Sequence, residues 1–372
     1  MPALATKPPS SRHLAMENLP QTVCLPPLKT ILAEFNTPIQ FHPMKEEAKL
    51  QTIKWISSFE NIDKKWLAII MQAHVDDLAA MMTHDLGFDD LVLTMRWYFW
   101  AFLIDDTMDS QQLSPEGVKN ILHLYEDVQR NRDLDASGPL PPIIAIFQSV
   151  WSKMREKKRP GFEGLFADAS IDYVRGLPQV TEFRNSSGVP DKETYKRHRR
   201  INVFMYSGFH FTGIILDRNI DNALVCSAEM KQLYAHLIEI CWLVNDILSW
   251  NMEQRSGDMW NFVSIIMIQD NKTVQEAMDD AEQELRSQVN QWWSAKTRVL
   301  EAYKAHQDIQ ALTLLIDRNQ LWGWFAVEWT YNYAPNRYFG SHQASEEAQR
   351  TGIVHIFPRR QEKATHAGGN HS

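Results

Sequence analysis

The chain of 372 residues has few cysteines, few glycines and no long apolar run. Its three cysteines, Cys24, Cys226 and Cys241, are too few and too scattered for a disulfide framework, which favours a reducing compartment and a cytoplasmic location. No uncharged apolar stretch reaches the ~20 residues of a membrane-spanning helix, so we expect no stable insertion into a membrane. The first thirty residues are rich in proline and serine and lack the apolar segment of a signal peptide.

An excess of positive charge is also missing. The formal net charge is −8, whereas a surface that binds phosphate backbones should be basic, so nucleic acid is not expected as a partner. Only 15 glycines are present and alternating β-branched residues are scarce, which favours helices over a sheet. What the chain has in abundance is aromatic mass, with 13 tryptophans and 17 phenylalanines, more than stability alone requires.

Apolar positions recur at helical spacing along most of the chain. This pattern predicts helices over residues 44–59, 63–86, 90–109, 116–131, 143–156, 162–175, 191–215, 227–253, 262–269, 273–303 and 307–332. No interior linker is long enough to separate two domains, so we predict an all-α fold, one large bundle over residues 29–352 around an apolar cavity. The six prolines of residues 1–28 indicate a disordered N-terminal arm, and the polar residues 353–372 indicate a flexible C-terminal tail.

The stretch from Trp97 to Asp109 is an aromatic and aliphatic run that ends in three carboxylates. If it is helical, Asp105 and Asp109 lie one turn apart on the same face. They project from the end of a helix whose preceding turns are almost wholly apolar, which suggests an apolar cavity with a charged rim. Carboxylates this close together need a counter-charge, and for clustered oxygen ligands the natural one is Mg²⁺.

A second group of oxygen donors lies late in the apolar helix predicted over residues 227–253. Asn245, Ser249 and Glu253 follow one another at intervals of four residues, so they form a stripe down one helix face. An amide, a hydroxyl and one carboxylate suit a single Mg²⁺ ion that keeps room for phosphate oxygens. Taken singly, an Asp pair at a helix end is more often solvated, and a polar stripe is more often a helix–helix contact. Both together in an aromatic-rich helical chain favour a shared metal site.

The two motifs resemble those of a known enzyme family. Asp105–Asp109 looks like the aspartate-rich DDxxD motif of class I terpene cyclases, and Asn245–Glu253 matches their NDxxSxxxE motif without a gap. The segment Tyr195–Arg200 resembles the one that carries the family's diphosphate-sensing arginine, and Arg337-Tyr338 matches the Arg-Tyr pair near the C-terminus. The similarity covers roughly residues 40–340 and is greatest to the fungal sesquiterpene synthases.

The resemblance implies a Mg²⁺-dependent lyase that ionises farnesyl diphosphate, releases diphosphate and cyclises the carbocation to a sesquiterpene hydrocarbon or alcohol. The residues implied as ligands of three Mg²⁺ ions are Asp105, Asp109, Asn245, Ser249 and Glu253. The implied diphosphate ligands are Arg200, Arg337 and Tyr338. The aromatic residues proposed to face the cavity and stabilise the cation are Phe99, Phe102, Trp329 and Tyr331, with Trp322 as a further candidate and Phe102 the favoured one.

Three positions depart from the family pattern or leave it ambiguous. Many relatives have Lys just before the final Glu of the second motif, where this chain has Met252, so the number of cations around the diphosphate is open. Phe204 stands four positions after Arg200, where a small residue is usual, and this bears on the shape of the helix break beside the substrate. Arg199 and Arg200 point about 100° apart on a helix, so only one faces the site, and the offset from Tyr195 favours Arg200.

Other functions are compatible with the same motifs. A cyclase that acts on a C20 or C25 prenyl diphosphate is the nearest alternative, because cavity volume cannot be read from sequence. Prenyl chain elongation would need a second aspartate-rich motif, and Asp279-Asp280 lacks the third Asp. A non-catalytic helical lipid-binding or scaffold protein is a third alternative. The terpene product, the quenching of the final cation by water and the oligomeric state, with a homodimer as one option, do not follow from the sequence.

Overall fold

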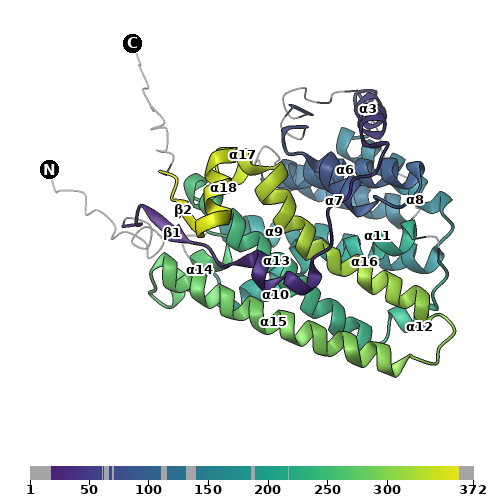
Figure 1. The fold of residues 1–372 in the computed structure, drawn as a ribbon. Helices are drawn as coiled ribbons and strands as arrows, with labels where there is room; N and C mark the ends of the chain where they lie inside the picture. The colour runs from purple at the N-terminus through teal and green to yellow at the C-terminus, as the bar shows by residue number, and fades with distance from the viewer. Residues whose placement is uncertain are drawn as a thin grey trace, which may run out of the picture.

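The computed structural model describes residues 18–60, 62, 67–68, 71–109, 115–130, 140–185, 189–216 and 218–359. Within them the chain is predominantly helical with very little sheet, which confirms the predicted all-α fold (Figure 1). The elements are β1 (Thr22–Cys24), α2 (Leu28–Ile31), the 3₁₀ turn η1 (Ala33–Phe35), α3 (Lys45–Ile56), α5 (Val75–Met82), α6 (Phe88–Asp109), α7 (Pro115–Arg130), α8 (Pro142–Glu156), α9 (Pro160–Asn185), α10 (Lys192–Asn202), α11 (Met205–Ile215), α12 (Asn222–Val225), α13 (Ala228–Ser256), α14 (Phe262–Gln269), α15 (Val274–Ala302), α16 (Ile309–Glu328), the π-helix η2 (Trp329–Tyr333), α17 (Pro335–Tyr338), α18 (His342–Thr351) and β2 (Ile353–His355). In this part of the chain, no helix is both long and apolar enough to cross a bilayer.

Helix α13 lies in the middle of the bundle because it is apolar on nearly every side. It packs along the long helix α15 and also contacts α10, α11, α14, α16 and α17 (Figure 1). Ser227 caps its first turn by accepting a hydrogen bond from the N–H of Met230, and Gly257 ends it in the left-handed region at φ 82°. The polar stripe of residues 245–253 is thus carried on a buried, well-capped helix.

Helix α6 is the second element on which the site depends, and it packs against α3, α5 and α8. Trp97, Phe99 and Trp100 are buried along it. The Trp100 indole N–H donates a 3.1 Å hydrogen bond to the carbonyl of Ile143 in α8, and its ring stacks on Tyr125 at 5.2 Å between centroids. This packing fixes the direction of α6, which ends at the aspartate motif.

A helix break interrupts the single helix predicted over residues 191–215. Helix α10 ends at Asn202, and α11 begins at Met205 after Phe204 adopts the left-handed region at φ 62°, ψ 10°. A bulky residue there is uncommon and strained, so the surrounding packing must hold it. The Phe204 ring lies 4.4 Å from that of Tyr173 and 5.8 Å from that of Trp97, between centroids. The aromatic contacts explain why the break falls at this residue.

A small antiparallel sheet joins the two ends of the described chain, where the sequence pattern indicated none. β1 pairs with β2, with Val23 opposite Val354. Two polar side chains of α13 hold the end of β2 and the segment after it: Asn251 donates to the carbonyl of His355 and Gln254 to that of Phe357, both at 2.8 Å. Residues 18–28 and 353–359 are therefore packed where a loose arm and tail were expected: the first segment bonds to the second and to Gln275 of α15, and buried amides of α13 bind the second. Residues 1–17 and 360–372 lie outside the described residues, and the proposed division into arm, domain and tail stays a prediction there.

Buried His210 in α11 gives the fold a predictable response to acid. It is 8% exposed, its Nδ1 has no hydrogen-bond partner in the described part of the chain, and burial lowers its pKa to about 4. The neutral form is therefore favoured in the folded state. As the pH falls below 6.5, the imidazole is protonated in the unfolded chain before it is protonated in the folded one. The stability that neutral His210 contributes is therefore complete above pH 6.5 and is lost as the pH falls towards 4. We expect up to about 3 kcal/mol of unfolding free energy to be lost through this group.

Urea denaturation of the wild type and His210→Phe at pH 7 and pH 4.5 measures this contribution. The variant should lose less stability between the two pH values than the wild type does. An equal loss in both proteins would show that His210 is not the group responsible.

Candidate active site

The ends of several helices surround two adjoining chambers. We call the first the polar chamber: it has a volume of about 580 Å³, and its lining includes Asp105, Arg184, Arg199, Asn245, Glu253 and Arg337. The second, the apolar chamber, has a volume of about 300 Å³, and its lining includes Tyr98, Phe102, Phe204, Trp322, Trp329 and Tyr338. Asp105, Asn245 and Glu253 line both, so the two motifs meet where the chambers join.

The three residues of the α13 stripe face this junction, as the sequence predicts. Asn245 and Glu253 line both chambers and Ser249 lines the apolar one. The Ser249 hydroxyl is buried, and the Glu253 carboxylate is an acceptor within its reach. The Glu253 carboxylate accepts one hydrogen bond from the Asn261 amide at 2.9 Å.

Burial raises the pKa of Glu253 well above its usual range, and the nearby carboxylates of Asp258 and Asp246 raise it further. Burial and the neighbouring carboxylates thus disfavour the ionised form of Glu253 when no cation is bound. A divalent cation would oppose this shift, because its positive charge favours the ionised carboxylate. The Ser249 hydroxyl, the Asn245 amide and the Glu253 carboxylate are hard oxygen donors, so these residues fit Mg²⁺.

Asp105 stands at the end of α6, solvent-exposed and facing the chambers. The Tyr173 hydroxyl of α9 lies 3.5 Å from Asp105 Oδ1. Asp109 is the last residue of α6, and its side chain lies outside the described residues, so its predicted metal role stays a prediction.

Arg199, and not Arg200, faces the chambers, so the predicted placement of Arg200 is wrong. The Arg199 side chain is 12% exposed and donates to Asp246 Oδ1 at 3.0 Å and to Asn245 Oδ1 at 2.5 Å. The Arg200 side chain is 45% exposed, forms an ion pair with Glu239 and lines neither chamber. The face of α10 that packs on α13 is marked by Tyr195, whose hydroxyl donates to Asp246 at 2.5 Å. Arg199 follows Tyr195 by four residues, so it shares that face.

The C-terminal pair predicted to bind diphosphate lies on α17. Arg337 lines both chambers and Tyr338 lines the apolar one. Tyr338 is 6% exposed, and burial raises the pKa of its phenol. The hydroxyl therefore keeps its proton and can donate a hydrogen bond to an anion.

Some of the predicted aromatic residues line the apolar chamber and others do not. Phe102, Trp322 and Trp329 do, and the Trp329 ring lies edge-on to Phe102 at 6.1 Å between centroids. Phe99 is fully buried in the core and does not line either chamber. It precedes Asp105 by six residues, which turns it about 120° away on the helix. Tyr331 also lies elsewhere, because its ring stacks on Phe339 at 5.0 Å.

The model of terpene synthase family 2, C-terminal metal binding, matches residues 96–291, which is more than half of the chain and includes both motifs. The chain belongs to this family. It is an enzyme, a class I terpene synthase, and the predicted family is confirmed.

Curated relatives and solved structures agree with this assignment. A silphinene synthase from Penicillium patulum is 24% identical over 309 residues, 81% of this chain and 82% of that protein. A (+)-eremophilene synthase from Gibberella fujikuroi is 24% identical over 245 residues, 64% of this chain and 68% of that one. The fold is similar to that of a linalool/nerolidol synthase from Streptomyces clavuligerus, with a TM-score of 0.70 at 17% identity, covering 81% of this chain and 98% of that one.

Some side chains that line the synthase's chambers were not predicted from the sequence. Tyr98 precedes Asp105 by seven residues, so helical spacing would have placed it on the same face. Arg184 and Asp258 line the polar chamber without such a signal. Helix α9 was expected to end near residue 175, but it continues through Pro178 to Asn185 and carries Arg184 to the chamber.

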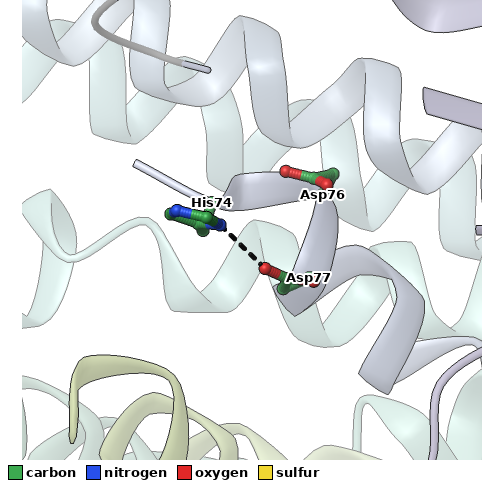
Figure 2. A group of neighbouring side chains, drawn as sticks. All are labelled: His74, Asp76 and Asp77. Carbon is green, nitrogen blue, oxygen red and sulfur yellow. Dashed lines mark hydrogen bonds and ion pairs between the residues drawn. The ribbon is translucent and has the colours of Figure 1, made fainter. Parts of the chain in front are cut away.

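A separate cluster at the start of α5 also has ligand-type residues. His74, Asp76 and Asp77 each offer an atom within 4.8 Å of the others, and Figure 2 shows the His74–Asp77 contact, 3.0 Å from Nδ1 to Oδ2. Two lysines of α3 neutralise the carboxylates: Lys49 lies 2.8 Å from Asp76 and Lys45 lies 2.6 Å from Asp77. The cluster is therefore balanced in charge and fastens α3 to α5. The His74 carbonyl also accepts a 3.0 Å hydrogen bond from the Trp329 indole, which helps to fix one wall of the apolar chamber.

Proposed function

We propose that this terpene synthase ionises farnesyl diphosphate with Mg²⁺ and cyclises the resulting carbocation to a sesquiterpene hydrocarbon or alcohol, releasing diphosphate. The observation that carries the proposal is the meeting of Asp105 with Asn245 and Glu253 where the polar chamber joins the aromatic-lined apolar one. The proposal places the diphosphate in the polar chamber and the hydrocarbon chain in the apolar chamber.

The chain's own residues would hold the metal from two sides. Asp105, with Asp109, lies on the α6 side, and Asn245, Ser249 and Glu253 lie on the α13 side, for three Mg²⁺ ions in all. When bound, Mg²⁺ supplies the positive charge that stabilises a departing diphosphate.

Arg199, Arg337 and Tyr338 would bind the diphosphate directly. The arginine fork suits two phosphate oxygens at once, and Arg199 is already oriented by Asp246. Because these donors are in place before the C–O bond breaks, they stabilise the charge that develops on the leaving group.

Phe102, Trp322 and Trp329 would fold the hydrocarbon chain and protect the cation. Their rings exclude water, and the partial negative charge of each ring face lies against the positive charge of the carbocation. The apolar chamber of about 300 Å³ is at the small end of ligand pockets, which favours a C15 chain over C20 or C25. The cytoplasmic location and the homodimer stay predictions of the sequence.

Incubation of the purified protein with C15, C20 and C25 prenyl diphosphates, followed by analysis of volatile products, tests this function. We expect a terpene hydrocarbon or alcohol from the C15 substrate with Mg²⁺ and none in matched EDTA controls. A product from only the C20 or C25 substrate would contradict the chain length. Longer diphosphates would indicate elongation, and unchanged substrates would favour a binding or scaffold role.

A further inference from the structure

Arg184 lines the polar chamber from the end of α9, on the side where α13 ends. Its Nε lies 3.0 Å from Asp258 Oδ2, and the two side chains are 23% and 22% exposed. Asp258 is itself fixed: its N–H donates to the carbonyl of Glu253 at 3.0 Å, and its Oδ1 accepts the N–H of Trp260 at 2.9 Å. Asp258 therefore fixes the guanidinium of Arg184 near Glu253, the last residue of the α13 stripe.

The charges in this corner explain why a cation is needed there. Asp258 and Glu253 both line the polar chamber, and without a counter-charge the Asp258 carboxylate would repel an entering diphosphate. Met252 lines both chambers beside them but brings no charge. The guanidinium of Arg184 forms an ion pair with Asp258 and so offsets its negative charge. Asp258 is not one of the three proposed metal ligands of α13.

Arg255 also lines the polar chamber near this corner, and its guanidinium is held differently. Its guanidinium lies over the ring of Phe357, 5.3 Å from the centroid. Arg184 forms an ion pair with a fixed carboxylate beside the polar chamber, whereas the Arg255 guanidinium lies on an aromatic ring, so Arg184 is the better placed of the two to bind a phosphate.

We infer that Arg184, positioned by Asp258, is a further diphosphate-binding residue that supplies the charge missing at Met252. The inference deepens the proposed function and rests on it. It assigns four cationic or phenolic donors to the anion: Arg184 joins Arg199, Arg337 and Tyr338. Asp258 is a positioning residue, since it acts through Arg184.

Calorimetric titration with inorganic diphosphate in the presence of Mg²⁺ tests the inference without turnover. Arg184→Gln should weaken binding about tenfold or more, because a charge-assisted contact is lost. Adding Met252→Lys to Arg184→Gln should restore most of the affinity, since the side chain at position 252 also lines the polar chamber. Arg175→Gln is the matched control: Arg175 lies on the same helix, is paired with Glu126 and is 60% exposed. It should leave the affinity unchanged.

A purely structural role for Arg184 would give a different pattern. In that case Arg184→Gln and Asp258→Asn would lower the unfolding temperature, but the double variant with Met252→Lys would not regain affinity. That result, or wild-type affinity in Arg184→Gln, would overturn the inference. If the wild type bound diphosphate but left every prenyl diphosphate unchanged, the proposed function would be wrong. The effect of Arg184→Gln on diphosphate affinity would still test the inference about Arg184.

Discussion

Replacing Arg199 by glutamine is expected to remove nearly all turnover and also to destabilise the fold. Arg199 pairs with Asp246, whose side chain is 2% exposed, so its loss leaves a buried carboxylate without its cation. Breaking a buried pair in this way costs about 3 kcal/mol or more. Loss of one donor to a developing anion lowers kcat by about a hundredfold or more. Steady-state kinetics and urea denaturation measure the two effects separately.

Arg200→Gln is the matched control, because Arg200 is the next residue along α10 and points away from the chambers. We expect its kcat to stay within a few-fold of the wild type. If Arg200→Gln abolished turnover while Arg199→Gln did not, the assignment of the facing arginine would have to be reversed.

Replacing Asp105 by asparagine is expected to abolish turnover while leaving the fold intact. Asp105 is exposed at the end of α6, so the unfolding free energy should change by less than about 1 kcal/mol. The amide keeps the shape of the side chain but removes the charge that would hold a divalent ion. We expect release of diphosphate from the substrate to fall by about a hundredfold or more, with the unfolding transition in place.

Asp89→Asn provides the comparison, since Asp89 is an exposed carboxylate in the first turn of the same helix. It should retain wild-type turnover. An Asp105→Asn variant that kept its activity would remove α6 from the proposed metal site.

The position of the site residues could be predicted from the sequence wherever it depends on spacing within one helix. Asn245, Ser249 and Glu253 fall on one face of α13 because four residues make about one turn, and Asp105 ends an apolar helix for the same kind of reason. Arg337 and Tyr338 were found by their resemblance to a family pair. Each of these residues lines a chamber.

What the sequence could not predict depends on neighbouring helices. Arg199 and Arg200 are both polar and adjacent, and only the packing of α10 on α13 selects Arg199. Phe99 and Phe102 are alike in type, but the neighbours of α6 bury Phe99 in the core. At the break, Phe204 adopts the left-handed backbone conformation although the apolar pattern continues through it. Helical spacing alone therefore did not predict the break.

The ends of the chain illustrate the same limit. Proline and polar residues predicted a loose arm and tail, yet β1 and β2 pair with one another. The buried amides of Asn251 and Gln254 that hold the segment after β2 lie about a hundred residues away in α13. Local composition carries no record of such long-range partners.

The central claim is that α6 and α13 hold one divalent-metal cluster at the junction of the two chambers. Anomalous diffraction from crystals grown with Mn²⁺ and inorganic diphosphate tests it most directly. We predict anomalous peaks beside Asp105 and beside the oxygens of Asn245, Ser249 and Glu253, with the diphosphate between them. Peaks confined to another place, such as the His74–Asp77 cluster, or no peaks at the junction, would contradict the claim.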